Sequence, residues 1–265
     1  MNSETNSDGG RSVGTTALPS MSMLTSVETD PENNCSHTLV VHDTVLQEAF
    51  EYRSADFQSM TWRDCRIQKH ILIRKMSAGN CIRHSVLLER VRGGAFSLSD
   101  FPVSEDFTVR DSQFLGAYQE KSFEAASDTA KRTLFERTRF GRHAADIVNA
   151  SARSEIALSQ GTQMHNQNLT LSECQVPYLK ADWVRTQEFC IEHSSSAIMV
   201  DLRYGHIGLL KIVAAQLRTL DLRCARIDRL EIVESDIELL DRSGAQIGSM
   251  DLQRSEEHGI HSIIG

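Results

Sequence analysis

The sequence lacks most of the features that mark membrane and secreted proteins. Only four prolines and 6% aromatic residues occur among its 265 residues. No apolar run approaches the roughly 18 residues of a membrane-spanning helix, so we expect no membrane span. The N-terminus also lacks the basic and then apolar arrangement of a secretory signal. We therefore expect a cytoplasmic protein, with export by a different route as the alternative.

The sequence also lacks recognisable catalytic and metal-binding motifs. It contains no glycine-rich phosphate loop, no nucleophile elbow and no His-Glu-x-x-His pair. The cysteines show neither Cys-x-x-Cys pairs nor metal-ligand spacing, which predicts free thiols in a reducing compartment. They are Cys35, Cys65, Cys81, Cys174, Cys190 and Cys224. We expect no cofactor and no enzyme, although scattered Ser, Cys and His side chains leave open a catalytic site assembled by folding.

What the sequence does contain is a five-residue repeat from Val200 to Leu252. Apolar residues occur in pairs two positions apart, and the residue within each pair is polar, as in Leu220-Asp221-Leu222. Ten of the eleven second members are leucine or isoleucine, and Arg242 is the exception. The second members are Leu202, Ile207, Ile212, Leu217, Leu222, Ile227, Ile232, Ile237, Arg242, Ile247 and Leu252. Such regularity predicts a repeat protein.

This period excludes a single helix and a single flat strand. In a helix a five-residue step turns by about 140°, so the apolar residues would scatter around the axis. In a strand an odd step reverses the face. The pattern fits short strands separated by corners. Likeness at twenty residues, with Ile207, Ile227 and Ile247 in one column, predicts four corners in each coil.

The units Leu220-Asp221-Leu222-Arg223-Cys224 and Ala225-Arg226-Ile227-Asp228-Arg229 resemble the pentapeptide repeat. That family has a small or apolar residue, a polar residue, Leu or Phe, and two outward residues. The resemblance implies an all-β solenoid, a right-handed quadrilateral β-helix. The sequence departs from the family pattern in its many central isoleucines and its large first members.

The remaining segments are assigned by composition and by weaker repeats. Residues 1–36 are rich in Ser, Thr and Asn, which predicts a disordered tail. Residues 37–120 contain fragments such as Met60-Thr61-Trp62 and Cys65-Arg66-Ile67, so we expect irregular N-terminal coils. Residues 166–257 form the regular C-terminal solenoid. Residues 258–265 are expected to cap its end or to pair with a second copy in a homodimer.

Residues 121–160 show apolar spacing that is typical of helices. Phe123, Ala126, Ala130 and Leu134 fall on one helical face, which predicts a helical hairpin inserted between two solenoid segments. The first part of this insert carries a cluster of basic residues, read either as a solvated face or as a contact for an acidic partner. They are Lys131, Arg132, Arg137, Arg139 and Arg142.

Charged residues on the C-terminal coils suggest a second candidate surface. The Asp-x-Arg units at Asp201 and Asp221 predict an outward, self-neutralised face. Beyond them acidic residues outnumber basic ones, which predicts a patch for a basic partner. Its members are Asp228, Glu231, Glu234, Asp236, Glu238 and Asp241.

These observations favour a non-enzymatic scaffold that binds a protein partner. The net charge of −8 makes nucleic acid an unfavourable partner. Three alternatives remain open. The Ser-rich start resembles the N-termini of secreted bacterial effectors, the family resemblance allows a DNA mimic that binds topoisomerases, and an enzyme site between the coils and the helical insert is the third.

Overall fold

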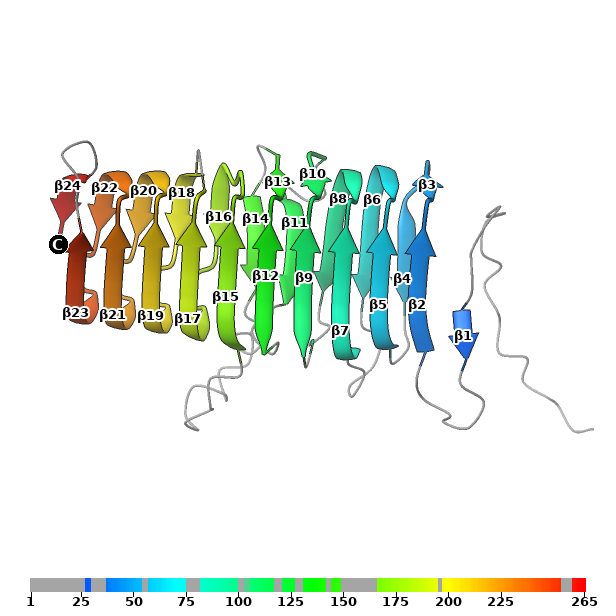
Figure 1. The fold of residues 1–265 in the computed structure, drawn as a ribbon, viewed down its shortest axis with the longest axis horizontal. Helices are drawn as coiled ribbons and strands as arrows, with labels where there is room; N and C mark the ends of the chain where they lie inside the picture. Colours follow the sequence, from blue (N-terminus) through cyan, green and yellow to red (C-terminus); the bar gives the residue numbers. More distant parts are fainter. Residues whose placement is uncertain are drawn as a thin grey trace, which may run out of the picture.

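The computed structural model shows an all-β solenoid. It describes residues 27–29, 37–53, 57–74, 82–99, 103, 105–116, 121–126, 131–141, 144–148, 166–194, 197–253 and 259–265. In these residues every regular element is a strand, and none is a helix. The strands form an 11-stranded and a 13-stranded sheet, which lie on opposite sides of the coils and run along the length of the solenoid (Figure 1).

The first sheet takes one strand from each coil and is parallel except at its first pair, β1 with β2. Its strands are β1 (Val27–Thr29), β2 (His37–His42), β5 (Phe57–Arg63), β7 (Ile82–Glu89), β9 (Asp106–Arg110), β12 (Arg132–Glu136), β15 (Asn166–Ser172), β17 (Arg185–Glu192), β19 (His206–Val213), β21 (Arg226–Val233) and β23 (Gln246–Gln253). We refer to it as sheet A.

The second sheet, sheet B, closes the other side of each coil. Its strands are β3 (Val45–Leu46), β4 (Phe50–Arg53), β6 (Arg66–Arg74), β8 (Arg92–Ser99), β10 (Gln113–Phe114), β11 (Lys121–Ala126), β13 (Arg139–Phe140), β14 (Ala144–Val148), β16 (Tyr178–Lys180), β18 (Ala197–Asp201), β20 (Gln216–Asp221), β22 (Asp236–Asp241) and β24 (Ile260–Ile264). All of its pairs are parallel, as β18 with β20 and β20 with β22 illustrate.

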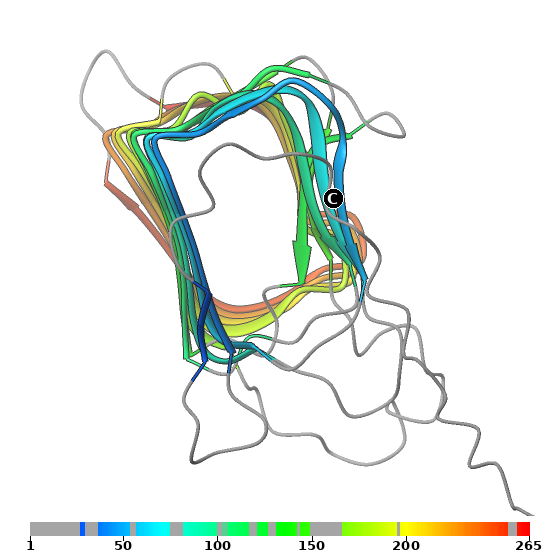
Figure 2. The same cartoon turned by 90° about the vertical axis from the view of Figure 1, so that its right-hand side faces the viewer.

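The coil is right-handed and four-sided. In Figure 1 the near strands point up, the far strands return downward, and successive coils advance from right to left. Figure 2 shows the four-sided outline along the axis. The expected quadrilateral β-helix is therefore confirmed. The strands are longer than the short pairs that we expected, because β19 and β21 each join two pentads and bend between them.

The C-terminal coils confirm the predicted inward columns. Ile207 pairs in register with Ile227, and Ile227 pairs with Ile247. These partners lie twenty residues apart, since both 227 minus 207 and 247 minus 227 equal 20. Ile207 and Ile227 are buried, whereas Ile247 is only partly covered because its coil is the last one. Burial of these apolar columns, worth about 25 cal/mol per Å², is the main force that holds the coils together.

The predicted helical hairpin at 121–160 is wrong in the described residues, because strands β11 to β14 occupy this region. β12 pairs with β9 on one side and β15 on the other, so sheet A is continuous. Within β12, Thr133 and Phe135 are buried, whereas Arg132, Leu134 and Glu136, which alternate with them, are more exposed. This alternation has the period of a strand. Pairing with the neighbouring coils therefore outweighs a local spacing that also suits a helix.

The described residues include a strand at each end of the solenoid. Strand β1 lies within the predicted disordered tail and pairs antiparallel with β2. It covers the edge of the first coil, where unpaired backbone groups would otherwise be exposed. At the other end, β24 continues sheet B by pairing with β22, so the predicted capping tail forms a further strand. The other residues of 1–36 lie outside the described residues.

The register of sheet A contains one irregularity in the C-terminal coils. Phe189 pairs with Leu210, a step of 21 residues, whereas Leu210 pairs with Leu230, a step of 20. The coil before Val200 therefore contains one additional residue. The described part of the chain contains no helix that is long and apolar enough to cross a membrane.

Candidate functional site

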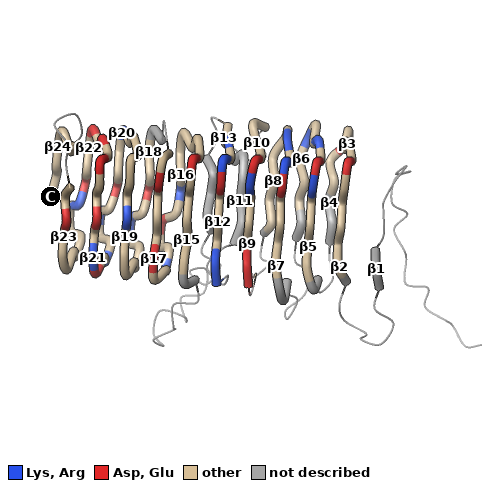
Figure 3. Tube along the Cα trace, viewed as in Figure 1, with Lys and Arg blue, Asp and Glu red and all other residues tan. Residues whose placement is uncertain are grey.

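Charged residues of alternating sign line the corner that follows sheet A in four successive coils. The first residue of the turn has a positive φ in each of these coils: Asp64, Arg90, Asp111 and Arg137. The residue before each turn carries the opposite sign: Arg63, Glu89, Arg110 and Glu136. Figure 3 shows red and blue segments alternating at the upper ends of β5, β7, β9 and β12. We call these eight residues the charge ladder.

Ion pairs join neighbouring coils across the ladder. Arg90 makes two hydrogen bonds to the Asp64 carboxylate, at 2.6 and 2.8 Å, and Arg137 makes two to Asp111, at 2.7 and 3.0 Å. Glu89 is nearly buried and contacts Arg63 at 2.5 Å and Arg110 at 3.0 Å. Opposite charges on adjacent rungs attract, so the eight residues neutralise one another.

These contacts shift the acid strength of the ladder carboxyl groups. The hydrogen bond from Arg90 lowers the pKa of Asp64, and the hydrogen bond from Arg137 lowers the pKa of Asp111. Both shifts favour the ionised form, because a guanidinium stabilises an adjacent carboxylate. The carboxylates of Asp64 and Asp111 are therefore held by their arginines and offer little free charge to a ligand.

A column of small inward residues supports the corner just beyond the ladder. The Ser112 hydroxyl donates to the Arg110 carbonyl at 2.8 Å and accepts from the Val91 amide at 3.1 Å. Ser235 makes equivalent contacts with Val233 and Ala215. These bonds satisfy backbone N–H and C=O groups that have no partner in the sheet at the turn. In Cys65, burial raises the pKa of the thiol, which disfavours the reactive thiolate.

The next column contains three arginines and a glutamine. Arg66 pairs in register with Arg92, Arg92 with Gln113, and Gln113 with Arg139. All three arginines are exposed, and among the described residues none of the three makes an ion pair. Rungs of a sheet are about 4.8 Å apart, so the column extends over about 14 Å. We call these four residues the arginine column.

Like charges on adjacent rungs repel. No acidic side chain of this column offsets the repulsion between Arg66 and Arg92. In the neighbouring charge ladder, by contrast, each arginine has an acidic partner in an adjacent coil. The arrangement therefore leaves guanidinium groups that are free to bind an anion.

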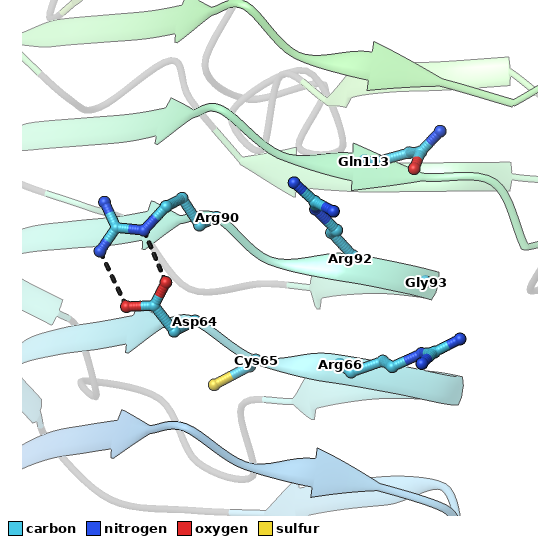
Figure 4. Close-up of a pocket in the computed structure, with 7 residues that line it drawn as sticks. All are labelled: Asp64, Cys65, Arg66, Arg90, Arg92, Gly93 and Gln113. Carbon is cyan, nitrogen blue, oxygen red and sulfur yellow. Dashed lines mark hydrogen bonds and ion pairs between the residues drawn. The ribbon is translucent and has the colours of Figure 1, made fainter.

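A shallow pocket of about 560 Å³ opens between the ladder and the arginine column. Its lining contains the Asp64–Arg90 pair together with Cys65, Arg66, Arg92, Gly93 and Gln113. Figure 4 shows that these residues come from three successive strands of the corner. Because the Asp64 carboxylate is engaged by Arg90, the remaining polar groups at the pocket are hydrogen-bond donors and the glutamine amide.

Glycines bring the backbones of adjacent coils close together beside the column. A Cβ atom on Gly94 would lie 1.5 Å from the carbonyl oxygen of Lys69, and one on Gly93 would lie 1.8 Å from that of Ile67. Gly93 also has a φ of +126°, which side chains rarely tolerate. Neighbouring Gly116 and Gly141 are similarly close to the preceding coil. Substitution of these glycines would therefore push adjacent coils apart beside the arginine column.

The structure separates the predicted basic residues of the insert. Lys131 pairs with Glu105 and Arg132 with Asp106, while Arg137 belongs to the charge ladder. Only Arg139 joins the arginine column. Arg142 lies outside the described residues. Acidic residues of the preceding coil thus neutralise Lys131, Arg132 and Arg137. Arg139 instead lies in one column with Arg66 and Arg92 of other coils.

The predicted acidic patch is divided among several sides of the coil. Asp228 and Glu231 lie on β21 of sheet A, Glu234 occupies a turn with positive φ, and the other three lie on β22. Most have basic partners. Arg229 contacts Glu231 at 2.6 Å, Arg218 contacts Glu238 at 3.6 Å, Arg223 contacts Asp241 at 3.6 Å, and His261 contacts Asp236 at 2.5 Å. The six residues do not form one face.

The Asp-x-Arg units neutralise themselves, as expected. Asp201, Asp221 and Asp241 pair in register as one column, and Asp201 and Asp221 are covered from solvent. The Asp221 carboxylate accepts from Arg223 Nε at 2.9 Å, from Arg223 Nη2 at 2.7 Å and from the Arg223 amide at 3.1 Å. Each arginine side chain therefore lies over the carboxylate two residues before it and leaves little free negative charge on this column.

The arginine column was missed because its spacing is irregular. Its members are separated by 26, 21 and 26 residues, from 66 to 92, 113 and 139. A search for twenty-residue likeness does not align them. The only available signal was the short unit Cys65-Arg66-Ile67 with its later counterparts Val91-Arg92-Gly93 and Thr138-Arg139-Phe140.

The described residues hold no group of three or more His, Cys, Asp or Glu side chains placed to bind a metal ion. Comparison of the chain with protein-family models, curated proteins and solved structures gives no match.

Proposed function

We propose that this chain is a non-enzymatic interaction scaffold, a divergent relative of the pentapeptide-repeat proteins, that binds a protein partner at the arginine column. The observation that carries the proposal is the set of exposed arginines without ion pairs, held on adjacent rungs beside a pocket. Parallel pairing fixes the spacing of these rungs. A rigid array loses little entropy on binding, which favours its use as a recognition surface.

The charge distribution favours this scaffold over a DNA mimic. Mimicry of a duplex requires a broad, continuous negative surface. Among the described residues, arginines engage acidic side chains at intervals along the whole solenoid, as in the Asp64–Arg90 and Asp201–Arg203 pairs, and so interrupt any negative surface. The charged side chains of the candidate site that make no ion pair with a described residue are Arg66, Arg92 and Arg139, so the site is positively charged. A partner with acidic groups therefore suits the site better than a basic one.

The test is photo-crosslinking in cells that produce the protein. Leu115 is 49% exposed next to the arginine column, and Tyr204 is 48% exposed on a C-terminal coil. Each is replaced in turn by p-benzoylphenylalanine in the full chain. We expect defined protein adducts from the Leu115 variant that the Tyr204 variant does not give. Equal adduct patterns from the two positions would overturn the proposal.

A further inference from the structure

We propose that the partner segment bound by the arginine column is an extended acidic peptide with carboxylates on alternate residues. This inference rests on the proposed function and names the chemistry of the partner. It starts from the positions of Arg66, Arg92, Gln113 and Arg139, which follow one another on adjacent rungs. A ligand that contacts all four must run along the solenoid axis, across the strands.

The spacing of the column matches that of an extended chain. If Arg66 marks the origin, rungs about 4.8 Å apart place Arg92, Gln113 and Arg139 at about 5, 10 and 14 Å. In an extended peptide, side chains on one face recur about every 6.8 Å. Three alternate carboxylates then lie at about 0, 7 and 14 Å. The outer two meet Arg66 and Arg139, and the middle one lies between Arg92 and Gln113.

The chemistry of the donors suits carboxylates. A guanidinium presents two parallel N–H groups that pair with both oxygens of one carboxylate. The corner already makes this interaction with its own residues, since Arg90 binds both oxygens of Asp64 and Arg137 both oxygens of Asp111. The amide of Gln113 supplies a further donor for the middle carboxylate.

The extent of the column favours a short peptide over a long polyanion. The column is bounded by neutral residues, with Val45 before Arg66 and Gln175 after Arg139. The adjacent charge ladder is neutral, and the chain carries a net charge of −8. A nucleic acid strand that continues beyond three phosphates would meet no further cations in this column and would be repelled by the overall charge.

Surrounding groups leave room for a peptide backbone. At Gly93, Gly94, Gly116 and Gly141 the backbones of adjacent coils approach so closely that these positions add no side chain beside the column. The pocket of about 560 Å³ next to Arg66 and Arg92 accommodates the first carboxylates. The exposed Leu115 offers apolar contact to an intervening residue of the peptide. These features place the backbone of the ligand beside Leu115 and its acidic side chains over the arginines.

The test measures fluorescence anisotropy of labelled five-residue peptides with the full-length protein at low salt. The probes are Asp-Thr-Asp-Thr-Asp, the clustered isomer Asp-Asp-Asp-Thr-Thr, and the neutral Asn-Thr-Asn-Thr-Asn. We expect the alternating peptide to bind at least about fivefold more tightly than the clustered one, because only the former reaches all three arginines. The neutral peptide should not bind.

Substitutions assign the binding to the column. Arg66→Gln, Arg92→Gln and Arg139→Gln should each weaken binding of the alternating peptide about threefold, and their combination about thirtyfold. Arg92→Lys should fall between wild type and Arg92→Gln, because lysine keeps the charge but not the two-pronged geometry. The matched control is Arg226→Gln, which removes an exposed positive charge from β21 and should leave binding unchanged.

Four outcomes overturn the inference. Equal binding of the alternating and clustered peptides would contradict the spacing, and an equal loss in Arg226→Gln would contradict the location. Tighter binding of a thymidine oligonucleotide with the same charge would assign the column to nucleic acid. If the peptides fail while Leu115 still gives protein adducts, only this inference is wrong. Peptide binding without adducts at Leu115 would instead overturn the proposed function.

Discussion

The N-terminal coils, residues 37–148, and the C-terminal coils, residues 166–253, share one fold but neutralise their charges differently. In the N-terminal coils most ion pairs of the described residues join neighbouring coils, as Arg90 joins Asp64 at 2.6 Å. In the C-terminal coils the shortest pairs lie within one coil, as Arg203 joins Asp201 at 2.7 Å. A coil whose charges are neutralised by the next coil requires a particular neighbour. A coil that neutralises most of its charges internally does not, so its sequence can be repeated.

The two halves also differ in their cores. Large aromatic side chains fill the N-terminal coils, where Phe114 contacts both Phe96 and Phe140 with ring centroids 6.1 and 6.2 Å apart. The C-terminal coils are filled mainly by stacked leucine and isoleucine. Register steps vary in the first half, for example 26 residues from Ile67 to Gly93, and are 20 in the last coils. Variation in coil length and in residue type therefore occurs in the same half as the arginine column.

Among the substitutions that test this difference between the two halves, we expect the glycine variants to have the largest effect on the free energy of unfolding. Gly94→Ala places a Cβ 1.5 Å from the Lys69 carbonyl oxygen, so the two backbones must separate and lose hydrogen bonds. We expect a loss of about 4 kcal/mol in the free energy of unfolding. In the C-terminal coils, Gly244→Ala meets only the Cys224 sulfur at 3.4 Å, although its φ is +70°. Its expected cost is about 1 kcal/mol.

Urea denaturation of both variants checks this prediction. The close backbone approach at Gly94 is a feature of the irregular coils, so the two costs should differ by more than the error of the measurement. Equal losses in the two variants would mean that the coils at Gly94 can separate without penalty.

The second comparison concerns the two kinds of ion pair. Asp221→Asn should cost about 2 kcal/mol, because it weakens three charge-assisted hydrogen bonds at a buried site. Asp111→Asn should cost at most about 1 kcal/mol, because its pair with Arg137 is substantially exposed. Thermal unfolding of both variants at neutral pH measures the difference, and a larger loss for Asp111→Asn would reverse the expected order.

The dependence on pH provides a control for Asp111. Arg137 lowers the pKa of this carboxyl below its ordinary value of 3.8. The stabilisation is therefore fully present above pH 3.8 and is lost as the pH falls through the folded-state pKa. Wild type and Asp111→Asn should approach the same stability in acid. A constant difference down to low pH would show that the carboxylate does not act through its charge.

Much of the fold was predictable from the sequence because its determinants are local and periodic. The columns of Ile207, Ile227 and Ile247 followed from a fixed five-residue period, and their pairing confirms it. The strands at 121–148 were not predicted, because their stability comes from pairing with β9 and β15, which lie far away in sequence. A local spacing at Phe123 and Ala126 that also suits a helix gave the wrong interpretation.

The candidate site was predictable only in part for the same reason. Arg139 was identified within a basic segment, but Arg66 and Arg92 reach it through registers set by coils of unequal length. The ion pairs of Lys131 and Arg132 with the preceding coil likewise connect residues 26 positions apart. Contacts between coils depend on coil length, which composition and short motifs do not reveal.

The smallest effect is expected at the end of the regular half, where Arg242 interrupts a leucine column. The equivalent residues of the two preceding coils, Leu202 and Leu222, are fully buried, whereas Arg242 is exposed. Its amide donates to the Ile264 carbonyl at 2.8 Å, so the backbone of this rung is already in place. Arg242→Leu should therefore stabilise the protein by about 0.5 kcal/mol, because the leucine covers apolar surface without moving the main chain.

The matched control for this last substitution is Arg226→Leu, which removes the same charge at an outward position of β21 and should bring no gain. If both variants melt at a higher temperature, the gain comes from lowering the charge or from general hydrophobicity, not from the leucine column. If Arg242→Leu melts at a lower temperature, the arginine contributes to the last coil through contacts of its own. The repeat would then end at Leu240, and the final rung would be held by β24 and not by the pattern that builds the coils before it.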